Sequence, residues 1–478
     1  MRYSTLNCII PVPNEVKASD KGEKLFFEKI DKVFSSSPVS SAALKEVISF
    51  FAFTGKTITE TQNENEAQIL FSFDDTLQKE AWKMEITEKS IRIFSGSKEG
   101  FSYAVTSLIQ MAFAALREGP STAYFDCGTI EDSPRFAYRG FMLDPSRHFQ
   151  DKEMVKKVIK MLAAFRINTL HWHLADNQSF RMPSSIVSGI VGKGTLTGGS
   201  YTKDDIKEIV DFAEVHHMNI IPELDVPGHS TMILSAFPQF ACDKDAPGRE
   251  YCLGNPEAKE FIKRLLDEVM ELFPHSKIIH VGGDEAETAS WEKCPKCLAA
   301  MKEKGLKNMR ELENDFMVDI TRYIVSKGRT PMMWGTCSGQ IYPSDTIMQA
   351  WLDIREPLRI APNKNKVVYS VHTSLYFDYP ANQSEPLESW MFELTEKGVY
   401  MTDPYILWED TLSEIIMGPE ACLWTETIPQ WRIIPKLLPR LSALSECAWS
   451  RNDRKDYYDF LRRREYLEAA GYYEYLRG

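Results

Sequence analysis

The sequence predicts an α/β protein, a (β/α)8 TIM barrel preceded by a small α+β domain, and three observations predict it. The chain has 478 residues, more than one compact domain usually holds. Beyond residue 133, eight short apolar segments alternate with longer stretches of helical periodicity. Carboxylate and aromatic residues follow these segments. We expect an N-terminal α+β domain over residues 1–133 and a barrel over residues 134–478.

The N-terminal domain is predicted from two strands and one helix. Residues 82–87 and 90–94 alternate polar and apolar side chains, as half-buried antiparallel strands do. Residues 100–116 have the spacing of a helix with one heavily apolar face. The polar, proline-bearing segment 131–135 then marks the domain boundary.

The barrel is predicted from eight segments that are mostly apolar throughout, as strands buried on both faces are. They lie at residues 138–144, 169–175, 219–225, 277–283, 329–335, 346–352, 366–372 and 419–425. Eight strands that alternate with helices favour a closed barrel. Strand count alone does not exclude a doubly wound open sheet.

Helices are well marked in the first half of the barrel. An apolar stripe runs from Met154 to Phe165 at helical spacing. Thr202 and Asp205 have the spacing of a capping box, and Asn255-Pro256 supplies an N-cap with a first-turn proline. Between the sixth and eighth strands the helical pattern is poor, so we expect irregular connections there.

Composition and charge exclude some partners. Apolar residues make up 43% of the chain and charged residues 26%, as in ordinary soluble domains. A net charge of −12 argues against nucleic acid or an anionic membrane surface as a partner, but does not oppose a neutral sugar. No apolar run reaches 18 residues, so no membrane span is expected. The oligomeric state is not indicated by the sequence.

The nine cysteines cannot all pair within one chain, because their number is odd. Cys294 and Cys297 form a lone CxxC, while Cys242 and Cys252 flank a polar loop. A zinc site would need two further ligands near the CxxC, and none lies at convincing spacing. We therefore favour a local disulfide or free thiols, and expect neither a metal nor a cofactor.

The predicted strand ends carry an unusual set of side chains. In (β/α)8 barrels the active site lies at this end of the strands. In chain order the set is Asp144, Arg147, Asp176, Asp225, His229, Asp284, Glu285, Trp334, Trp351, Tyr376, Asp378, Trp424 and Glu426. Taken singly, a Trp here is more often packing and an Asp more often a cap, while His171 and His173 could fill barrel layers. Together they predict a sugar pocket, in which aromatic rings pack on the pyranose and charged groups bind its hydroxyls.

The adjacent carboxylates Asp284 and Glu285 are the sharpest signal. Two neighbouring acids near a buried strand end repel each other, so one of them should have a raised pKa and stay protonated near neutral pH. That would separate them into an acid and a charged stabiliser. The preceding Gly282-Gly283 would allow substrate or backbone to approach closely.

The chain resembles the family 20 glycoside hydrolases, the β-N-acetylhexosaminidases. The resemblance covers residues 135 to about 450 in the expected order and is highly specific in combination. Its motifs are RGFMLDPSRH at 139–148, HWHLADNQS at 171–179, PELDVPGH at 222–229, HVGGDE at 280–285, YFD at 376–378 and EACLWTE at 420–426, with Trp334 and Trp351. The N-terminal unit resembles the small α+β domain that precedes the barrel in this family.

The resemblance implies substrate-assisted, retaining hydrolysis of terminal β-linked N-acetylhexosamine, GlcNAc or GalNAc, from glycans or glycoconjugates. The sugar's acetamido oxygen would attack C1 and form an oxazolinium intermediate. The implied catalytic residues are Asp284, which would orient the acetamido N–H, Glu285, the acid and then base, and Tyr376, a donor to the acetamido oxygen.

The resemblance also implies the sugar-binding residues. Trp334, Trp351 and Trp424 would wall the acetamido methyl and the sugar face. Arg147, Asp378 and Glu426 would bind hydroxyls, in either the gluco or the galacto configuration. Asp176 and His229 would position Glu285 and tune its pKa, and Asp225 would lie near Asp284.

Three features bear on the aglycone side and on location. The stretch after Gln178 is shorter than the loop often seen in this family, which leaves the aglycone side open. Asn177 and Asn382 are formal glycosylation acceptors, and a glycan on Asn177 would sit at the pocket mouth. The N-terminus lacks the pattern of a signal peptide, or such a peptide was removed. We expect a bacterial enzyme that is periplasmic or secreted.

Two other functions fit parts of the pattern. A non-catalytic sugar-binding protein would keep the pocket, but it should have lost an acid or the tyrosine, and Asp284, Glu285 and Tyr376 are all present. A barrel hydrolase could instead use a carboxylate nucleophile, or a metal held by His229 and the acids. A covalent glycosyl adduct or sensitivity to chelators would distinguish these.

Overall fold

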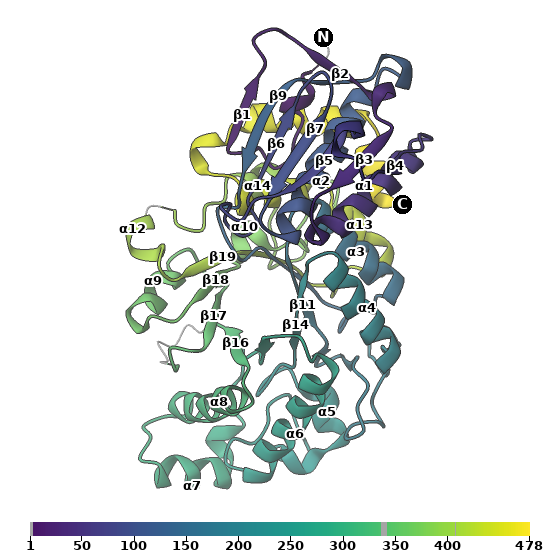
Figure 1. Cartoon of the computed structure of the whole chain (residues 1–478). Helices are drawn as coiled ribbons and strands as arrows, with labels where there is room; N and C mark the ends of the chain where they lie inside the picture. Colours follow the sequence, from purple (N-terminus) through teal and green to yellow (C-terminus); the bar gives the residue numbers. More distant parts are fainter. Residues whose placement is uncertain (1–2, 336–341, 407) are drawn as a thin grey trace. The chain divides into compact units, whose positions relative to one another are not determined.

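The computed structural model describes residues 3–335, 342–406 and 408–478 (Figure 1). The chain forms two compact units. One comprises Met1–Ala137, Lys160–Arg166 and Leu441–Gly478, and the other comprises Tyr138–Ile159 and Ile167–Arg440. The predicted division at residue 133 stays a prediction, since the first unit also takes in the last 38 residues of the chain.

The N-terminal unit contains a mixed seven-stranded sheet in the order β1-β9-β6-β7-β5-β3-β4. Its strands are β1 (Glu15–Ala18), β3 (Lys32–Ser35), β4 (Thr59–Glu60), β5 (Ile69–Phe73), β6 (Trp82–Ile86), β7 (Ile91–Ser95) and β9 (Gly128–Asp132), and β2 (Lys24–Phe26) pairs separately with β8 (Tyr124–Asp126). Helices α1 (Ser41–Phe53) and α2 (Lys98–Leu116) pack on each other and on this sheet (Figure 1). The predicted antiparallel pair, β6 with β7, and the helix that follows are confirmed.

The C-terminal helices α15 (Tyr457–Ala469) and α16 (Tyr472–Arg477) belong to the same unit. The buried guanidinium of Arg463 donates to the Ile9 carbonyl at 2.7 Å and to Glu446 at 2.6 Å. The Gln110 side chain on α2 donates to the Ile10 carbonyl at 2.8 Å and lies 3.4 Å from the Tyr472 hydroxyl. Buried polar groups need such partners, so these bonds join the two ends of the chain.

The second unit is a closed eight-stranded parallel barrel, which confirms the predicted fold class and removes the open sheet. Closure is made by β10 and β19, where Gly140 lies opposite Glu420. The strands are β10 (Gly140–Leu143), β11 (Thr169–His173), β14 (Asn219–Glu223), β15 (Ile278–His280), β16 (Thr330–Trp334), β17 (Ile347–Ala350), β18 (Val367–Tyr369) and β19 (Ile416–Leu423). Each lies within or overlaps a predicted strand.

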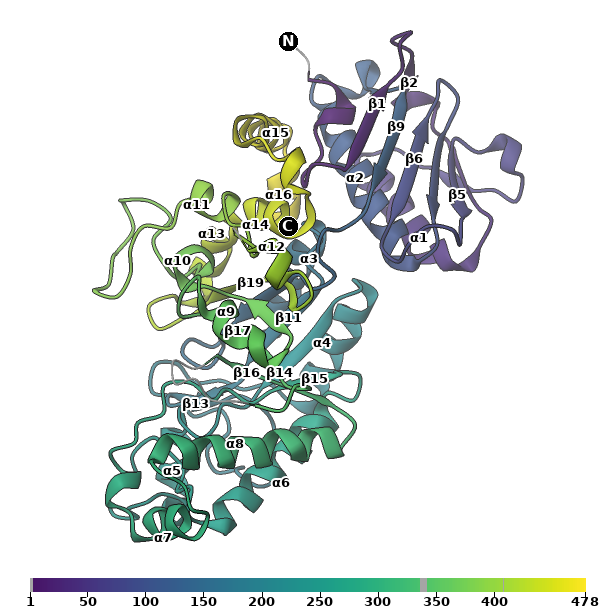
Figure 2. The ribbon, with the colours of Figure 1, turned by 90° about the vertical axis from the view of Figure 1, so that its left-hand side faces the viewer.

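Three helices lie at the predicted signals: α3 (Lys152–Ala164), α4 (Lys203–Val215) and α6 (Pro256–Leu272). No signal had been assigned to α5 (Thr231–Ala236), α7 (Pro295–Glu303) or α8 (Met309–Ser326). Thr202 and Asp205 form the expected capping box on α4, and Asn255 caps α6. Helix α6 lies beside both α4 and α8 (Figure 2).

The connections between β17 and β19 are largely irregular, as expected, and their helices are short. They contain only α9 (Glu356–Ile360), α10 (His372–Leu375), α11 (Glu396–Tyr400) and α12 (Glu409–Leu412) among the described residues. No helix in the described ranges is both long enough and apolar enough to cross a bilayer.

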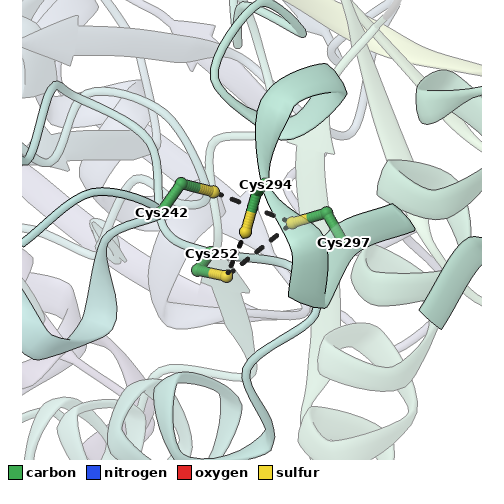
Figure 3. A group of neighbouring side chains, drawn as sticks. All are labelled: Cys242, Cys252, Cys294 and Cys297. Atoms are coloured by element: carbon green, nitrogen blue, oxygen red, sulfur yellow. Dashed lines mark hydrogen bonds between the residues drawn. The ribbon is translucent and has the colours of Figure 1, made fainter. Parts of the chain in front are cut away.

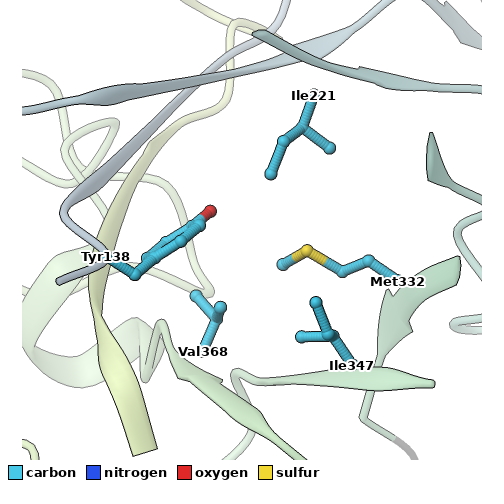
Figure 4. Close-up of a cluster of buried hydrophobic side chains, with 5 residues drawn as sticks. All are labelled: Tyr138, Ile221, Met332, Ile347 and Val368. Atoms are coloured by element: carbon cyan, nitrogen blue, oxygen red, sulfur yellow. The ribbon is translucent and has the colours of Figure 1, made fainter. Parts of the chain in front are cut away.

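Side chains fill the barrel interior in layers. One layer is an apolar cluster of Tyr138, Ile221, Met332, Ile347 and Val368 (Figure 4). Because side chains on a strand alternate between its two faces, the residues two positions further along also face inward. That next layer is polar and buried, and it contains Glu223, Trp334, Gln349 and Ser370. The strand ends above it carry the predicted site.

Candidate active site

A buried carboxylate organises the polar layer beneath the site. Glu223 accepts a hydrogen bond from the Trp334 indole at 2.8 Å and lies 2.9 Å from Nδ1 of His280 and 3.1 Å from Nε2 of His171. His173 contacts the same carboxylate. Burial alone would raise the pKa of Glu223, but the surrounding histidines hold it well below its usual value. The ionised Glu223 therefore fixes the orientation of Trp334.

His173 links this layer to Asp176. Its Nε2 lies 2.9 Å from Asp176 Oδ2, and its other nitrogen contacts Glu223. Burial would lower the pKa of His173, but the two carboxylates raise it well above its usual value. Asp176 lies in β12 (Ala175–Asp176), which pairs with β13 (Ser179–Phe180) in a short hairpin after β11. The hairpin, and not the strand itself, brings Asp176 to the rim.

Arg147 follows β10 and is surrounded by acids. Its guanidinium lies 2.8 Å from Asp176, 3.1 Å from Asp144 and 3.6 Å from Glu426. The guanidinium carbon also lies 4.9 Å from the ring centroid of Trp424. Burial opposes the charge of Arg147, but the three carboxylates outweigh it and raise its pKa well above the usual value. Arg147 is thus a fixed cation at the rim.

His229 connects Asp176 with the Asp284–Glu285 pair. Its Nδ1 lies 3.2 Å from Asp176, and its Nε2 lies 3.7 Å from Asp284 and 3.6 Å from Glu285. Both His229 and Glu285 have φ near +47°, a left-handed conformation that costs energy for residues with a side chain. Burial would lower the pKa of His229, but Asp225, Asp176 and Asp284 raise it well above its usual value.

Asp225 lies close to Asp284. A Cβ on Gly282, whose φ is +65°, would come within 1.7 Å of the Asp225 carboxylate, so the position requires glycine. The Gly283 N–H donates to Asp225 at 3.3 Å. Burial and the charge of Asp284 raise the pKa of Asp225 well above its usual value. Burial also raises the pKa of Asp284, against the opposing charge of His229. Burial and mutual repulsion therefore disfavour two charged carboxylates at this place.

The pKa of Glu285 differs in direction from our expectation that it is the protonated acid. The close contact with His229, whose Nε2 lies 3.6 Å from the carboxylate, holds the pKa of Glu285 below its usual value. The side chain is 52% exposed, compared with 12% for Asp284, so burial raises its pKa too little to reverse this. In the ligand-free site Glu285 is therefore ionised, and Asp284 is the neighbour with the raised pKa.

Aromatic rings form one side of the site. The ring centroids of Trp334 and Trp424 lie 5.6 Å apart, and those of Tyr376 and Trp424 lie 6.2 Å apart. Tyr376 follows α10 and is held beside β19 by a bridge to Cys422. Trp351 follows β17, and its indole donates to the Gly335 carbonyl at 3.0 Å. These rings offer the apolar surface that packs on a pyranose.

Asp378 is buried near this wall. It is 5% exposed, and its Oδ1 has no hydrogen-bond partner in the described part of the chain. Burial, followed by the charge of Glu426, raises the pKa of Asp378 well above its usual value. An unpartnered buried acid is costly, so it is suited to a ligand hydroxyl.

Several residues that support the site were not predicted as site residues. Glu223, His280 and Glu420 connect the polar layer, with Glu420 2.8 Å from His171 Nδ1. Arg249 lies far along the loop after β14, and its guanidinium donates to the Glu285 carbonyl at 2.6 Å. Glu223 and Glu420 had one available signal, since each is an acid inside an otherwise apolar predicted strand. Nothing in the local sequence marks Arg249.

Asp225, His229 and Asp284 are close enough to share a metal ion, because one ligand atom from each lies within 4.8 Å of the others. A metal ligand must be a neutral imidazole, however, and the three surrounding carboxylates favour the charged form of His229. The arrangement suits an ion-pair network better than a cation site.

Paired carboxylates beside a wall of aromatic rings, at the rim of a (β/α)8 barrel, place the chain among the glycoside hydrolases. Residues 136–452 match the glycosyl hydrolase family 20 catalytic domain, and residues 7–133 match domain 2 of that family. The chain belongs to glycosyl hydrolase family 20. Hydrolysis assisted by the substrate is characteristic of this family.

Relatives and solved structures agree with this membership. A β-hexosaminidase of Akkermansia muciniphila is 30% identical over 81% of this chain and 83% of its own length. One from Porphyromonas gingivalis is 29% identical over 95% of this chain and 62% of its own length. The structure of a family 20 exo-β-N-acetylglucosaminidase of Vibrio harveyi, with N-acetylglucosamine, superposes with a TM-score of 0.87 at 27% identity, covering 100% of this chain and 78% of that one.

Proposed function

We propose that this chain is a retaining β-N-acetylhexosaminidase that releases terminal β-linked N-acetylhexosamine from glycans or glycoconjugates. The nucleophile is the substrate's own acetamido oxygen. It forms a bond to C1 while the glycosidic bond breaks, and Glu285 gives its proton to the leaving oxygen. Water then attacks C1 of the oxazolinium ring, returns a proton to Glu285 and restores the acetamido group with retained configuration.

The observation that carries this proposal is the unpartnered oxygen of Asp284. Its Oδ1 is buried and has no hydrogen-bond partner among the described residues, while its other oxygen faces His229 at 3.7 Å. A buried acceptor without a donor is unfavourable unless a ligand supplies one. The acetamido N–H of the substrate is such a donor. Asp284 would hold the amide with its oxygen toward C1 and stabilise the positive charge that develops on it.

Glu285 is suited to meet the leaving group because its side chain is half exposed. An aglycone bound over it would exclude water and disfavour the charged form, which raises the pKa of Glu285 when substrate is present. The low pKa of Glu285 in the free site is compatible with its role as acid in the complex.

Tyr376 and the tryptophans would bind the acetamido group. The Tyr376 ring lies next to Trp424, and burial raises the pKa of its hydroxyl well above the usual value, so it stays a donor. It would donate to the acetamido oxygen and hold that atom in line with C1. Trp334, Trp351 and Trp424 would enclose the methyl group and one sugar face.

The outer hydroxyls would be bound by charged groups. Arg147 offers a fixed fork of donors, while Asp378 and Glu426 offer acceptors or, when protonated, donors. Burial raises the pKa of Glu426 against the charge of Arg147. The three groups can serve an equatorial or an axial 4-hydroxyl, so both GlcNAc and GalNAc are proposed substrates.

The direct test compares sugars that differ only at C2. Nitrophenyl N-acetyl-β-glucosaminide and the galactosaminide should be cleaved, whereas the plain β-glucoside should not. Replacing the acetyl group with trifluoroacetyl weakens the carbonyl nucleophile, so it should lower kcat steeply. A thiazoline that mimics the oxazolinium ring should inhibit. Equal rates on the N-acetyl sugar and the plain glucoside, or a trapped glycosyl–enzyme ester, would refute the mechanism.

For location we propose a bacterial enzyme that is periplasmic or secreted. The Asn177 side chain supports a source that does not glycosylate this site. The Asn177 Oδ1 accepts hydrogen bonds from the Thr231 N–H at 3.1 Å and from the Thr231 hydroxyl at 2.7 Å. The Asn177 Nδ2 lies 3.5 Å from His229, which leaves little room for a glycan. Fractionation of the source cells with an activity assay tests this, and activity confined to the cytosolic fraction would contradict it.

A further inference from the structure

Four cysteines from two separate stretches of the sequence meet in the barrel unit (Figure 3). Sγ of Cys252 lies 3.6 Å from Sγ of Cys294 and 3.7 Å from that of Cys297. Sγ of Cys242 lies 3.7 Å from that of Cys297. All four sulfur atoms lie within 4.8 Å of one another, and each cysteine except Cys242 is buried.

These distances fit a metal better than disulfides. A disulfide requires sulfur atoms about 2.05 Å apart, whereas four thiolates around zinc, each about 2.3 Å from the ion, lie about 3.8 Å from one another. We propose that Cys242, Cys252, Cys294 and Cys297 bind one structural zinc ion as a tetrathiolate site. The thiols release their protons to water on binding, four Zn–S bonds form, and the site carries two negative charges.

The surrounding backbone is shaped for this cluster. The Gly254 N–H donates to Sγ of Cys297 at 3.4 Å, a contact that stabilises a thiolate. A Cβ on Gly254 would lie 2.2 Å from the Lys296 carbonyl oxygen, so only glycine allows the two segments to approach so closely. Cys294 is the N-cap residue of α7, and Cys297 lies in its first turn. The buried Trp291 indole donates to the Tyr251 carbonyl at 2.9 Å and joins the same segments.

Spacing along the chain did not indicate this site, because Cys252 and Cys294 are 42 positions apart. Two loops supply the ligands. Cys242 and Cys252 lie in the connection from β14 to α6, and a bridge between Ala241 and Tyr251 closes the loop that joins them. The CxxC lies in the connection after β15. The spacing favoured a local disulfide or free thiols, but a local disulfide would join only two of the four sulfur atoms, and free thiols would give none of them a reason to converge.

The zinc would anchor the segment that supports the catalytic loops. Immediately before Cys252, the Tyr251 N–H donates to the Pro227 carbonyl at 2.9 Å, and the Arg249 carbonyl accepts from the Ser230 N–H at 3.0 Å. Arg249 also donates to the Glu285 carbonyl at 2.6 Å. The segment thus spans the loop that carries His229 and the loop that carries Glu285. Zinc binding would hold both loops through it.

The decisive measurement is the metal content of the full chain, purified without chelator and without added metal. We expect about one zinc per chain by elemental analysis, with X-ray absorption showing four sulfur neighbours at about 2.3 Å. Four thiols that react freely in the native, metal-free protein would overturn the proposal. A mass lower by four hydrogens, which indicates two disulfides, would also overturn it, as would stoichiometric iron in place of zinc.

The zinc content of cysteine variants distinguishes loss of the metal site from general effects of replacing a cysteine. Cys252→Ser and Cys294→Ser should lose most of the zinc, whereas Cys127→Ser, a buried cysteine of the N-terminal unit, should keep it. Cys242→His should retain zinc because imidazole is also a zinc ligand, and Cys242 is the most accessible of the four. Equal zinc content in Cys252→Ser and Cys127→Ser would refute the assignment, and so would loss of zinc from Cys127→Ser alone.

The structural role is tested on the folded wild-type chain. Removing zinc with a thiol-reactive mercurial and a reductant should lower Tm by about 5 °C or more and speed amide exchange at residues 249–252. Readdition of zinc, but not of magnesium, should restore both. An unchanged Tm and unchanged exchange after complete removal would contradict the anchoring role.

Discussion

The imidazole of His229 lies 3.2 Å from the carboxylate of Asp176, which orients it so that its other nitrogen faces Asp284 and Glu285. Asp176 is in turn held by Arg147 at 2.8 Å and by His173 at 2.9 Å. A series of side chains with alternating charge, Arg147, Asp176 and His229, therefore leads to Asp284 and Glu285. Such supporting contacts orient groups that touch the substrate.

His229→Gln should lower kcat about 10- to 100-fold and leave KM within a few-fold, because the residue positions Glu285 and does not bind the sugar itself. Steady-state kinetics on a nitrophenyl N-acetyl-β-glucosaminide measure both constants. The matched control is His275→Gln, which replaces an exposed histidine. An increase in KM with unchanged kcat would contradict the positioning role.

Asp284→Asn and Glu285→Gln should each reduce kcat about 10²–10⁴-fold without unfolding the chain. The rates of the two variants should depend differently on the leaving group of the substrate. Glu285→Gln should recover much of its rate on a substrate whose leaving group needs no proton, whereas Asp284→Asn should not. Circular dichroism and Tm report folding. Near-normal turnover in both variants would rule out the assigned pair.

Tyr376→Phe should reduce kcat/KM about 10²–10³-fold, since it removes one preorganised donor to the acetamido oxygen. Tyr379→Phe is the control on the same segment, because its hydroxyl lies 2.8 Å from His372 and is assigned no contact with the sugar. It should stay within a few-fold of wild type. Similar losses in the two variants would show that the tyrosines act through packing alone.

Asp176→Asn should lower stability by about 3–5 kcal/mol near neutral pH, because it leaves the buried cations Arg147, His173 and His229 partly unpaired. Burial would raise the pKa of Asp176, but Arg147 and then the histidines hold it well below its usual value. A depressed pKa contributes stability above the unfolded value of about 4, and this contribution falls as pH decreases below it. The difference in Tm between wild type and variant should be constant from about pH 5 to 7 and shrink below about pH 4. A difference that grows on acidification would refute the charge argument.

Local sequence patterns were sufficient to predict the strands and the starts of two helices. The eight strands, the capping box at Thr202 and Asp205 and the N-cap at Asn255 lie where periodicity and capping residues predicted them. These features depend on neighbours within a few positions, which the sequence contains directly. The location of site residues at strand ends followed from the barrel, since parallel strands bring their carboxyl ends to one rim.

Other features depend on residues that are distant in sequence. We expected Glu285 to be the protonated acid. Contact with His229 instead lowers the pKa of Glu285, and burial raises the pKa of Asp284. A dipeptide does not encode how deeply each side chain is buried. The polar layer around Glu223 likewise became evident only when two strands, β11 and β15, placed three histidines around it.

By itself, the sequence determined the order of the helices and strands and the motifs of the family to which the chain belongs, because periodicity, caps and motifs are short-range properties. The tertiary structure decided that the eight strands close into a barrel and do not form an open sheet. Only the tertiary structure decided which carboxylate is buried, that His229 lies between Asp176 and the acid pair, and that Cys242 and Cys252 meet Cys294 and Cys297. The physical reason is that desolvation and charge–charge energies depend on distances across the folded chain, which spacing along the sequence does not contain.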